Sequence, residues 1–254
     1  MSEYKEKTVI ITGGAAGIGY AIAKAFLAEK ANVIIADNNY QSLERAEKEL
    51  PCSGGRLITS LCDVSKRNDL FDVVRKAIHE TGRIDIMINN AGITMGPNNI
   101  EDLSPEFIEH MLGINLNGVI WGTQAALKEL KKSDGGVILN IASISAVRPR
   151  PGRSIYTASK LAVIGITKSV SLEAASHGIR CLVINPVASD TDMLNDLIGD
   201  DNDYLKERNK ILDTIPAGRL CQPDDVAKAA LFLCSSDAKM ITGSCIDVDG
   251  GRGV

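Results

Sequence analysis

The stretch TVIITGGAAGIG, residues 8–19, runs from a short β-branched segment directly into a glycine-rich turn. Residues 18–30 then repeat apolar side chains every three or four positions, which predicts a helix. Glycines at such a junction let the backbone approach a pyrophosphate, and the free N–H groups of the helix N-terminus bind its charge. Close packing of a strand on a helix also requires small residues, so the turn alone leaves both readings open. The predicted pyrophosphate contacts are Gly13, Ala16, Gly17, Ile18 and Gly19.

An acidic residue, Asp37, ends the next apolar segment, 18 positions after Gly19. At this place a carboxylate can accept hydrogen bonds from the hydroxyls of an adenosine ribose. The same charge would repel a 2′-phosphate, and no Arg or Lys occupies residues 14–17 or 38–41 to hold one. The pattern therefore favours NAD over NADP. The alternative for Asp37 is a solvated strand end.

Seven short apolar segments alternate with amphipathic helical stretches along the chain. They are apolar along nearly their whole length, as expected for strands covered on both sides. We therefore predict an α/β fold, a doubly wound Rossmann fold whose seven-stranded parallel sheet carries helices on both faces. A closed barrel fits less well, because it needs eight similar strand-helix units. The predicted strands are residues 8–12, 32–37, 57–64, 84–92, 136–143, 179–186 and 244–251.

Length and composition favour one globular domain over residues 1–254. The chain has 44% hydrophobic and 24% charged residues, which argues against disorder, and no linker or repeat divides it. A net charge of −4 with scattered Lys and Arg residues argues against binding to nucleic acid or an anionic membrane. No apolar run approaches the ~20 residues of a membrane span. Since the N-terminus also lacks a secretion signal, we expect a cytoplasmic protein.

The residues that most often bind metal ions are dispersed. The six cysteines never occur as CxxC, so we expect reduced, packed thiols. The three histidines are far apart, and the HETG motif at residues 79–82 lacks the second histidine of a zinc-binding helix. We therefore expect no metal.

The connection over residues 188–218 is longer than its counterparts and has an acidic, glycine-punctuated middle. Long insertions at the carboxyl ends of sheet strands are commonly lids over a substrate. We expect a substrate lid here, and the alternative is a plain surface excursion.

Further motifs follow the glycine turn in chain order: Asp63-Val64 at the end of the third predicted strand, NNAG over residues 89–92 and YTASK over residues 156–160. With TGGAAGIG, they make residues 8–251 resemble the short-chain dehydrogenase/reductase (SDR) family. The resemblance implies an NAD(H)-dependent enzyme that interconverts a secondary alcohol and its ketone, with a catalytic tetrad of Asn115, Ser143, Tyr156 and Lys160. The cofactor contacts that it implies, besides the turn, are Asp37, Asp63, Val64, Asn90, Tyr156, Lys160, Ser189 and Thr191.

The residue types of the tetrad suit this chemistry. Hydride transfer at a carbinol carbon requires a proton to reach or leave the oxygen, and Tyr156 is the candidate acid/base group. Lys160 lies one helical turn away on the same face, where its charge favours the phenolate. Ser143 can hydrogen-bond the substrate oxygen. By the family resemblance, Lys160 also contacts the nicotinamide ribose and Asn115 fixes a water that passes the proton to solvent.

The sequence departs from the family at two positions. Val187 stands after Asn185-Pro186 where the family usually has glycine, and it cannot take a positive φ comfortably. We therefore expect a different backbone path or cofactor tilt there. Many relatives end the first helix with a glycine, and we expect Asn32 to supply the left-handed conformation instead.

Two other functions compete with this interpretation. A non-catalytic NAD-binding sensor or scaffold would keep the fold without turnover, although the intact tetrad argues against it. An epimerase or dehydratase of the larger related family would need an added substrate domain, for which 254 residues leave no room. By resemblance we also expect a homodimer or homotetramer, paired through helices at residues 105–131 and 157–176.

Candidate substrates are a hydroxysteroid, a sugar or sugar acid, or a 3-oxoacyl compound. Arg148, Arg150 and Arg153 fall in the loop between Ser143 and Tyr156, and Pro149 and Pro151 stiffen that loop. One interpretation is that an arginine binds an anionic group remote from the ketone. The favoured alternative is a solvated basic loop, or an intersubunit ion pair with acids such as Asp200, Asp201 and Asp203.

Overall fold

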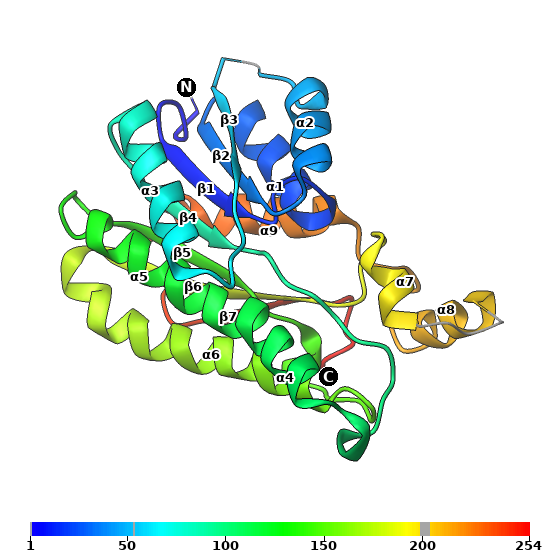
Figure 1. Cartoon of the computed structure of the whole chain (residues 1–254). Coiled ribbons are helices and arrows are strands. Elements are labelled where there is room, and N and C mark those ends of the chain that lie inside the picture. Colours follow the sequence, from blue (N-terminus) through cyan, green and yellow to red (C-terminus); the bar gives the residue numbers. More distant parts are fainter. Residues whose placement is uncertain (1, 53, 199–203) are drawn as a thin grey trace.

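A seven-stranded parallel sheet forms the centre of the computed structural model, which describes residues 2–52, 54–198 and 204–254 (Figure 1). The strand order is β3-β2-β1-β4-β5-β6-β7. The sheet therefore reverses its winding between β1 and β4, the place where open α/β sheets bind ligands. The strands are β1 (Thr8–Thr12), β2 (Asn32–Asp37), β3 (Leu57–Leu61), β4 (Ile86–Asn89), β5 (Gly136–Ile141), β6 (Ile179–Pro186) and β7 (Cys245–Val248).

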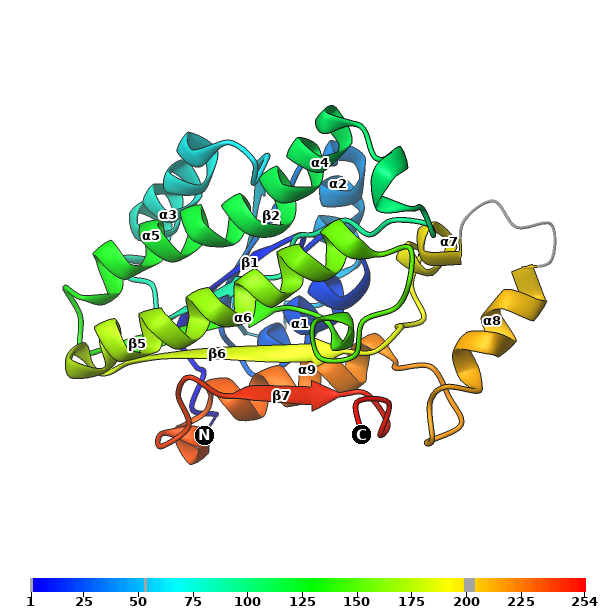
Figure 2. The same cartoon turned by 90° about the horizontal axis from the view of Figure 1, so that it is seen from below.

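Helices cover both faces of the sheet, as the alternation of apolar segments predicts. Figures 1 and 2 show α1 (Gly17–Ala28), α2 (Tyr40–Glu49) and α9 (Pro223–Cys234) on one face. The opposite face carries α3 (Arg67–Thr81), α4 (Pro105–Leu112), α5 (Gly118–Leu130) and α6 (Ser154–Ala174). Beyond the carboxyl ends of β6 and β7 lie α7 (Met193–Ile198) and α8 (Tyr204–Leu212) (Figure 2).

Alternating residues of each strand divide the core into two layers. Val9 and Ile11 of β1 pack with α1, α2 and α9, whereas Ile10 packs with α3 and α5. These β1 residues are fully buried, as expected for a parallel sheet between two helical layers. In the described part of the chain, no helix combines the length and the apolar character needed to cross a membrane.

Four strands end earlier than the sequence predicts, at the edge of the sheet that also holds the glycine turn. β3 ends at Leu61 instead of residue 64, and β4 ends at Asn89 instead of residue 92. β5 and β7 end two and three residues short of their predicted limits of 143 and 251. The residues past these ends leave the ladder, and many of them line a pocket instead. The sequence overestimates these strands because some residues past their ends, such as Val64 and Ala142, are still apolar and buried.

The expectation for Asn32 is wrong. Lys30, with φ of 67°, takes the left-handed conformation after α1, and Asn32 is already the first residue of β2. The Lys30 and Ala31 N–H groups donate to the carbonyls of Leu27 and Phe26, which closes the last turn of the helix. The chain must reverse before Asn32 because the Asn32 N–H pairs with the carbonyl of Lys7 beside β1.

Candidate active site

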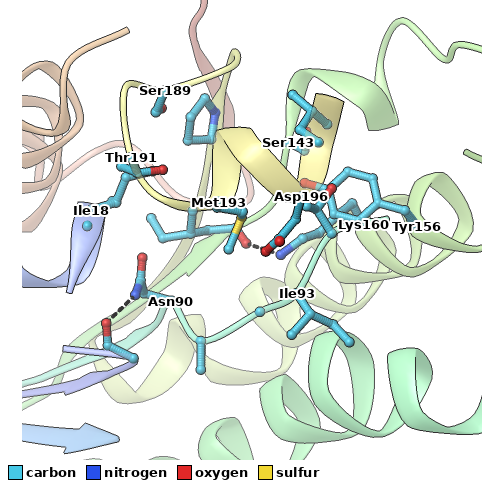
Figure 3. A pocket seen from close by; sticks show the side chains of 18 of the residues that line it. Ile18, Asn90, Ile93, Ser143, Tyr156, Lys160, Ser189, Thr191, Met193 and Asp196 are labelled. Carbon is cyan, nitrogen blue, oxygen red and sulfur yellow. Dashed lines mark hydrogen bonds between the residues drawn. The ribbon is translucent and has the colours of Figure 1, made fainter. Parts of the chain in front are cut away.

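A pocket of about 680 Å³ opens at the carboxyl ends of the strands. It extends from the glycine turn and Asp37 past the ends of β4 and β5 to the segment that follows β6. In Figure 3, Ile18, Asn90 and Thr191 lie toward one end, and Ser143, Tyr156 and Lys160 lie toward the other. Residues of α7, including Met193 and Asp196, lie between these groups. The pocket therefore joins the predicted cofactor turn to the predicted catalytic residues.

The glycine turn is shaped for close approach of a ligand to the backbone. Gly13 has φ of 60°, a conformation that other L residues rarely adopt. A Cβ on Gly19 would lie 2.1 Å from the Gly13 carbonyl oxygen, so a larger residue would break the turn. No side chain caps α1 at Ala16, and its first turn carries no acidic residue. The N-terminal N–H groups of this helix therefore suit a phosphate group.

Asn90 ties the glycine turn to the end of β4. Its side-chain amide donates to the carbonyl oxygens of Thr12 (2.9 Å) and Gly13 (3.0 Å). In return, the Thr12 hydroxyl accepts from the backbone N–H groups of Asn90 and Ala91, both at 3.0 Å. Asn90, a predicted cofactor contact, lines the pocket, and these bonds also hold the turn in shape.

Asp37, Asp63 and Val64 line the pocket at the ends of β2 and β3. The Asp37 carboxylate accepts from the backbone N–H groups of Ala15 (3.2 Å) and Asn39 (3.1 Å). This carboxylate is partly exposed and therefore open to a ribose. A hydrogen bond from the Ser65 hydroxyl lowers the pKa of Asp63.

Three of the four predicted tetrad residues stand on the pocket wall, and the fourth stands behind it. Ser143, Tyr156 and Lys160 line the pocket, and all three are at least nine-tenths buried. Asn115 is fully buried, accepts from the Ile93 N–H (2.8 Å) and donates to the Ile93 carbonyl (2.9 Å). Its Oδ1 and the Lys160 Nζ flank Gly92, because both lie 3.1 Å from the position of a Cβ on that glycine.

A π-turn over Gly113–Asn117 joins α4 to α5 and carries Asn115. This wider turn redirects side chains locally, and such turns are frequent at functional sites. The Asn115 amide also donates to the Ser159 hydroxyl (3.2 Å) on α6. The π-turn is therefore bonded both to the segment after β4 and to the helix that carries Tyr156.

Burial dominates the electrostatics of the catalytic pair. It raises the pKa of Tyr156, and hydrogen bonding with Ser143 and the charge of Arg153 act in the opposite direction. Burial lowers the pKa of Lys160 to about 8, and its ammonium donates to the Ile141 carbonyl at 3.1 Å. The sequence assigns the charge that favours the phenolate to Lys160, whereas the cation found to lower the pKa of Tyr156 is Arg153.

Arg153 lies close enough to Tyr156 for its charge to lower the pKa of the phenol. From the sequence, Arg153 is considered only as a possible ligand for an anion. It directly precedes α6, its side chain is 9% exposed, and its Nη2 donates to the Leu197 carbonyl in α7. Its Nη1 is buried without a partner in the described ranges. The sequence signal for this position is the adjacency to the helix that carries Tyr156.

Val187, where the family usually has glycine, does not take a positive φ. The Val187 N–H donates to the Val248 carbonyl (3.1 Å), and its side chain is buried in the core. In the described residues, a positive φ outside glycine occurs only at Glu6 and Lys30. Val187 therefore continues the pairing of β6 with β7 without strain. Ser189 and Thr191, both predicted cofactor contacts, follow it on the pocket wall.

Arg148 and Arg150 also reach the pocket, where each has a fixed neighbour. Arg148 donates to the backbone oxygen atoms of Arg252 (2.8 Å) and Val254 (3.0 Å). Arg150 donates to the Thr214 hydroxyl at 2.7 Å. Asp200, Asp201 and Asp203, considered above as ion-pair partners, lie outside the described residues. No cluster of three or more His, Cys, Asp or Glu side chains that could hold a metal occurs in the described ranges.

Comparison with family models, curated proteins and solved structures identifies the chain as an oxidoreductase. The family model described as "Enoyl-(Acyl carrier protein) reductase" matches residues 13–252. The chain belongs to the short-chain dehydrogenase/reductase family, in agreement with its doubly wound sheet and glycine turn. Its relatives act as dehydrogenases and reductases on alcohol and ketone groups.

Two curated relatives match almost the whole chain. The 4-formylbenzenesulfonate dehydrogenase TsaC1/TsaC2 of Comamonas testosteroni is 40% identical over 98% of both chains. The 3-oxoacyl-[acyl-carrier-protein] reductase FabG of Chlamydia trachomatis serovar D is 39% identical over 96% of both chains. Among solved structures, the 3-ketoacyl-(acyl-carrier-protein) reductase of Brucella melitensis, complexed with NADH, is 38% identical with a TM-score of 0.92. It covers 99% of this chain and is itself covered completely.

Proposed function

We propose that this protein transfers a hydride between NAD(H) and a secondary alcohol or its ketone. The observation that carries the proposal is the single pocket that connects the glycine turn and Asp37 with Ser143, Tyr156 and Lys160. Bound NAD supplies or accepts the hydride, and the residues that fit it are the turn, Asp37, Asp63, Val64, Asn90, Ser189 and Thr191.

Each catalytic side chain has a separate task in this proposal. The Tyr156 hydroxyl donates a proton to the ketone oxygen, or accepts one from the alcohol in the reverse direction. Ser143 donates a hydrogen bond to the same oxygen and orients the substrate for hydride transfer. Lys160 contacts the cofactor ribose. Asn115, bonded to both oxygen and nitrogen of Ile93, orders the backbone where a water would relay the proton.

Turnover tests the proposal against a protein that binds NAD without catalysis. We expect NADH to be oxidised when members of a panel of ketones are added. The readout is the loss of absorbance at the band of the reduced nicotinamide. A sensor or scaffold would bind NADH with unchanged absorbance across the whole panel. That result would leave the fold intact and remove the proposed activity.

Asp37 is expected to set the cofactor preference, because its carboxylate accepts from ribose hydroxyls and opposes an added phosphate. The Asp37→Ser variant should weaken NADH use and permit some NADPH use. The ratio of kcat/KM for the two cofactors should change by a factor that corresponds to about 1.5–3 kcal/mol, the range of a hydrogen bond to a charged group. Asp134→Ser, away from the pocket, is the control. An unchanged ratio in Asp37→Ser would mean that Asp37 does not contact the ribose.

Arg153 is expected to shift the pH dependence of alcohol oxidation. Its charge lowers the pKa of Tyr156, so Arg153→Met should raise that pKa and move the rising limb of kcat/KM to higher pH. Arg153→Lys should keep the limb near its original pH, because it keeps a positive charge. Arg75→Met, exposed on α3, is the control. A limb that stays in place in Arg153→Met would show that the charge does not reach the phenol.

The surroundings of the site support three further parts of the proposal. Residues 188–218, of which 199–203 lie outside the described residues, act as a substrate lid on the single domain. The support comes from α7, which lines the pocket and accepts a hydrogen bond from Arg153 at the Leu197 carbonyl. The protein acts in the cytoplasm, which suits its unpaired cysteines. It forms a homodimer or homotetramer, which would cover exposed apolar side chains such as Leu161 and Leu172 of α6.

A further inference from the structure

Three arginines from two distant segments of the chain line the pocket. Arg148 and Arg150 belong to the loop between Ser143 and Tyr156, and Arg252 belongs to the turn after β7. All three line the same pocket as the catalytic side chains. We propose that Arg148, Arg150 and Arg252 form a subsite for an oxyanion of the substrate, a carboxylate or sulfonate remote from the reacting carbonyl. This inference rests on the proposed function and specifies its substrate class.

Hydrogen bonds hold the side chains of Arg148 and Arg150 in place. The carbonyl oxygen of Arg252 accepts from Arg148, so the loop and the turn after β7 fix each other. Thr214, which follows α8, accepts from Arg150. Arg252 itself is 6% exposed, and its Nε is buried without a hydrogen-bond partner in the described part of the chain. The cluster is therefore ordered yet keeps an unmet donor.

Within the described ranges, no Asp or Glu side chain lies within ion-pair distance of Arg148, Arg150 or Arg252. In the described ranges, the arginines that form ion pairs are elsewhere: Arg56, Arg75, Arg83 and Arg219. Burial lowers the pKa of Arg150 and Arg252, and neighbouring arginines lower it further. Asp249 acts in the opposite direction on Arg252, but its carboxylate also accepts from the backbone N–H of Gly251 (3.0 Å).

Clustered like charges in a half-buried wall are unfavourable unless an anion joins them. Guanidinium groups suit planar and tetrahedral oxyanions because they donate two parallel hydrogen bonds. The acidic residues on the pocket wall stand at other places: Asp37 and Asp63 follow β2 and β3, and Asp192 and Asp196 belong to the α7 segment. A substrate that carries its anion toward Arg252 and its carbonyl toward Tyr156 would match this distribution.

Matched pairs of substrates test the subsite. We would compare 4-acetylbenzenesulfonate with acetophenone, and 4-acetylbenzoate with its methyl ester, as the ratio of kcat/KM for the anionic and neutral members. Wild type should favour the anion. Arg150→Gln and Arg252→Gln should each reduce the ratio about 10- to 100-fold, the loss expected for a hydrogen bond to a charged group. Arg150→Lys should reduce it less, and Arg75→Gln should leave it unchanged. An unchanged ratio in both Gln variants overturns the proposal.

A binding measurement separates this proposal from the proposed activity. Titration of benzenesulfonate, which has no carbonyl, into the wild-type protein with NADH should show saturable binding by calorimetry. Arg150→Gln should raise its Kd at least tenfold, and circular dichroism would verify that this variant is folded. Binding without turnover of any ketone would contradict the activity and keep the anion subsite. Turnover of ketones with no binding of benzenesulfonate would contradict the subsite and keep the activity.

Discussion

The Tyr156→Phe variant is expected to lose turnover by about 10²–10⁴-fold while binding NADH as wild type does. The substitution removes the only proton that this proposal transfers to the substrate oxygen. It preserves the ring, which packs in a small buried cluster with Met95 and Met111. The loss should therefore fall on kcat rather than on folding or cofactor affinity.

The measurements for Tyr156→Phe are steady-state kcat with a reactive ketone and NADH affinity by fluorescence titration. Tyr40→Phe is the matched control, because Tyr40 is 60% exposed at the start of α2 and loses the same hydroxyl. Activity of Tyr156→Phe within tenfold of wild type would reject Tyr156 as the acid/base group.

The Lys160→Ala variant should lose both cofactor affinity and rate. The Lys160 ammonium is 4% exposed, donates to the Ile141 carbonyl and lies beside Gly92, at the junction of the cofactor turn and the catalytic wall. Removing it should raise the Kd for NADH about 10- to 100-fold through the lost ribose contact. The rate should fall by about 100-fold or more, because the positive charge that the sequence assigns to favouring the Tyr156 phenolate is lost.

NADH titration and kcat at saturating NADH separate the two effects in Lys160→Ala. Lys168→Ala, exposed on the same helix, is the control. A lower kcat with unchanged NADH affinity would contradict the ribose contact. Because the pKa of Lys160 is about 8, the wild-type cofactor affinity should also weaken as the pH rises through this value and the ammonium loses its charge.

The sequence predicts the framework of the molecule well, because local patterns carry it. The glycine turn at residues 12–19 and the alternation of apolar segments identify the doubly wound sheet, and β1, β2 and β6 have the predicted bounds. The strand ends on the pocket side are overestimated, since composition alone does not tell an apolar strand residue from an apolar residue on a pocket wall. Val64 is such a residue, buried beyond the end of β3.

Contacts between distant residues are what the sequence does not predict. Arg153 reaches Leu197, 44 residues away, and Arg148 reaches Arg252, 104 residues away. Neither pair has a local signal, since each joins a loop to a segment placed by the whole sheet. Lys30 shows the same limit on a smaller scale, because the place of the chain reversal depends on where β2 must pair with β1.

The π-turn at Gly113–Asn117 equals one residue inserted into an otherwise regular helix. Deleting a residue from it would restore the α-helical repeat and rotate the preceding side chains by about 100° relative to α5. Asn115 would then leave the Ile93 backbone, although the helix itself would gain in regularity. A single-codon deletion here should therefore abolish catalysis, and it would also turn the buried Met111 of α4 away from its cluster. When relatives are aligned, the length of this turn is therefore as informative about activity as the presence of the asparagine.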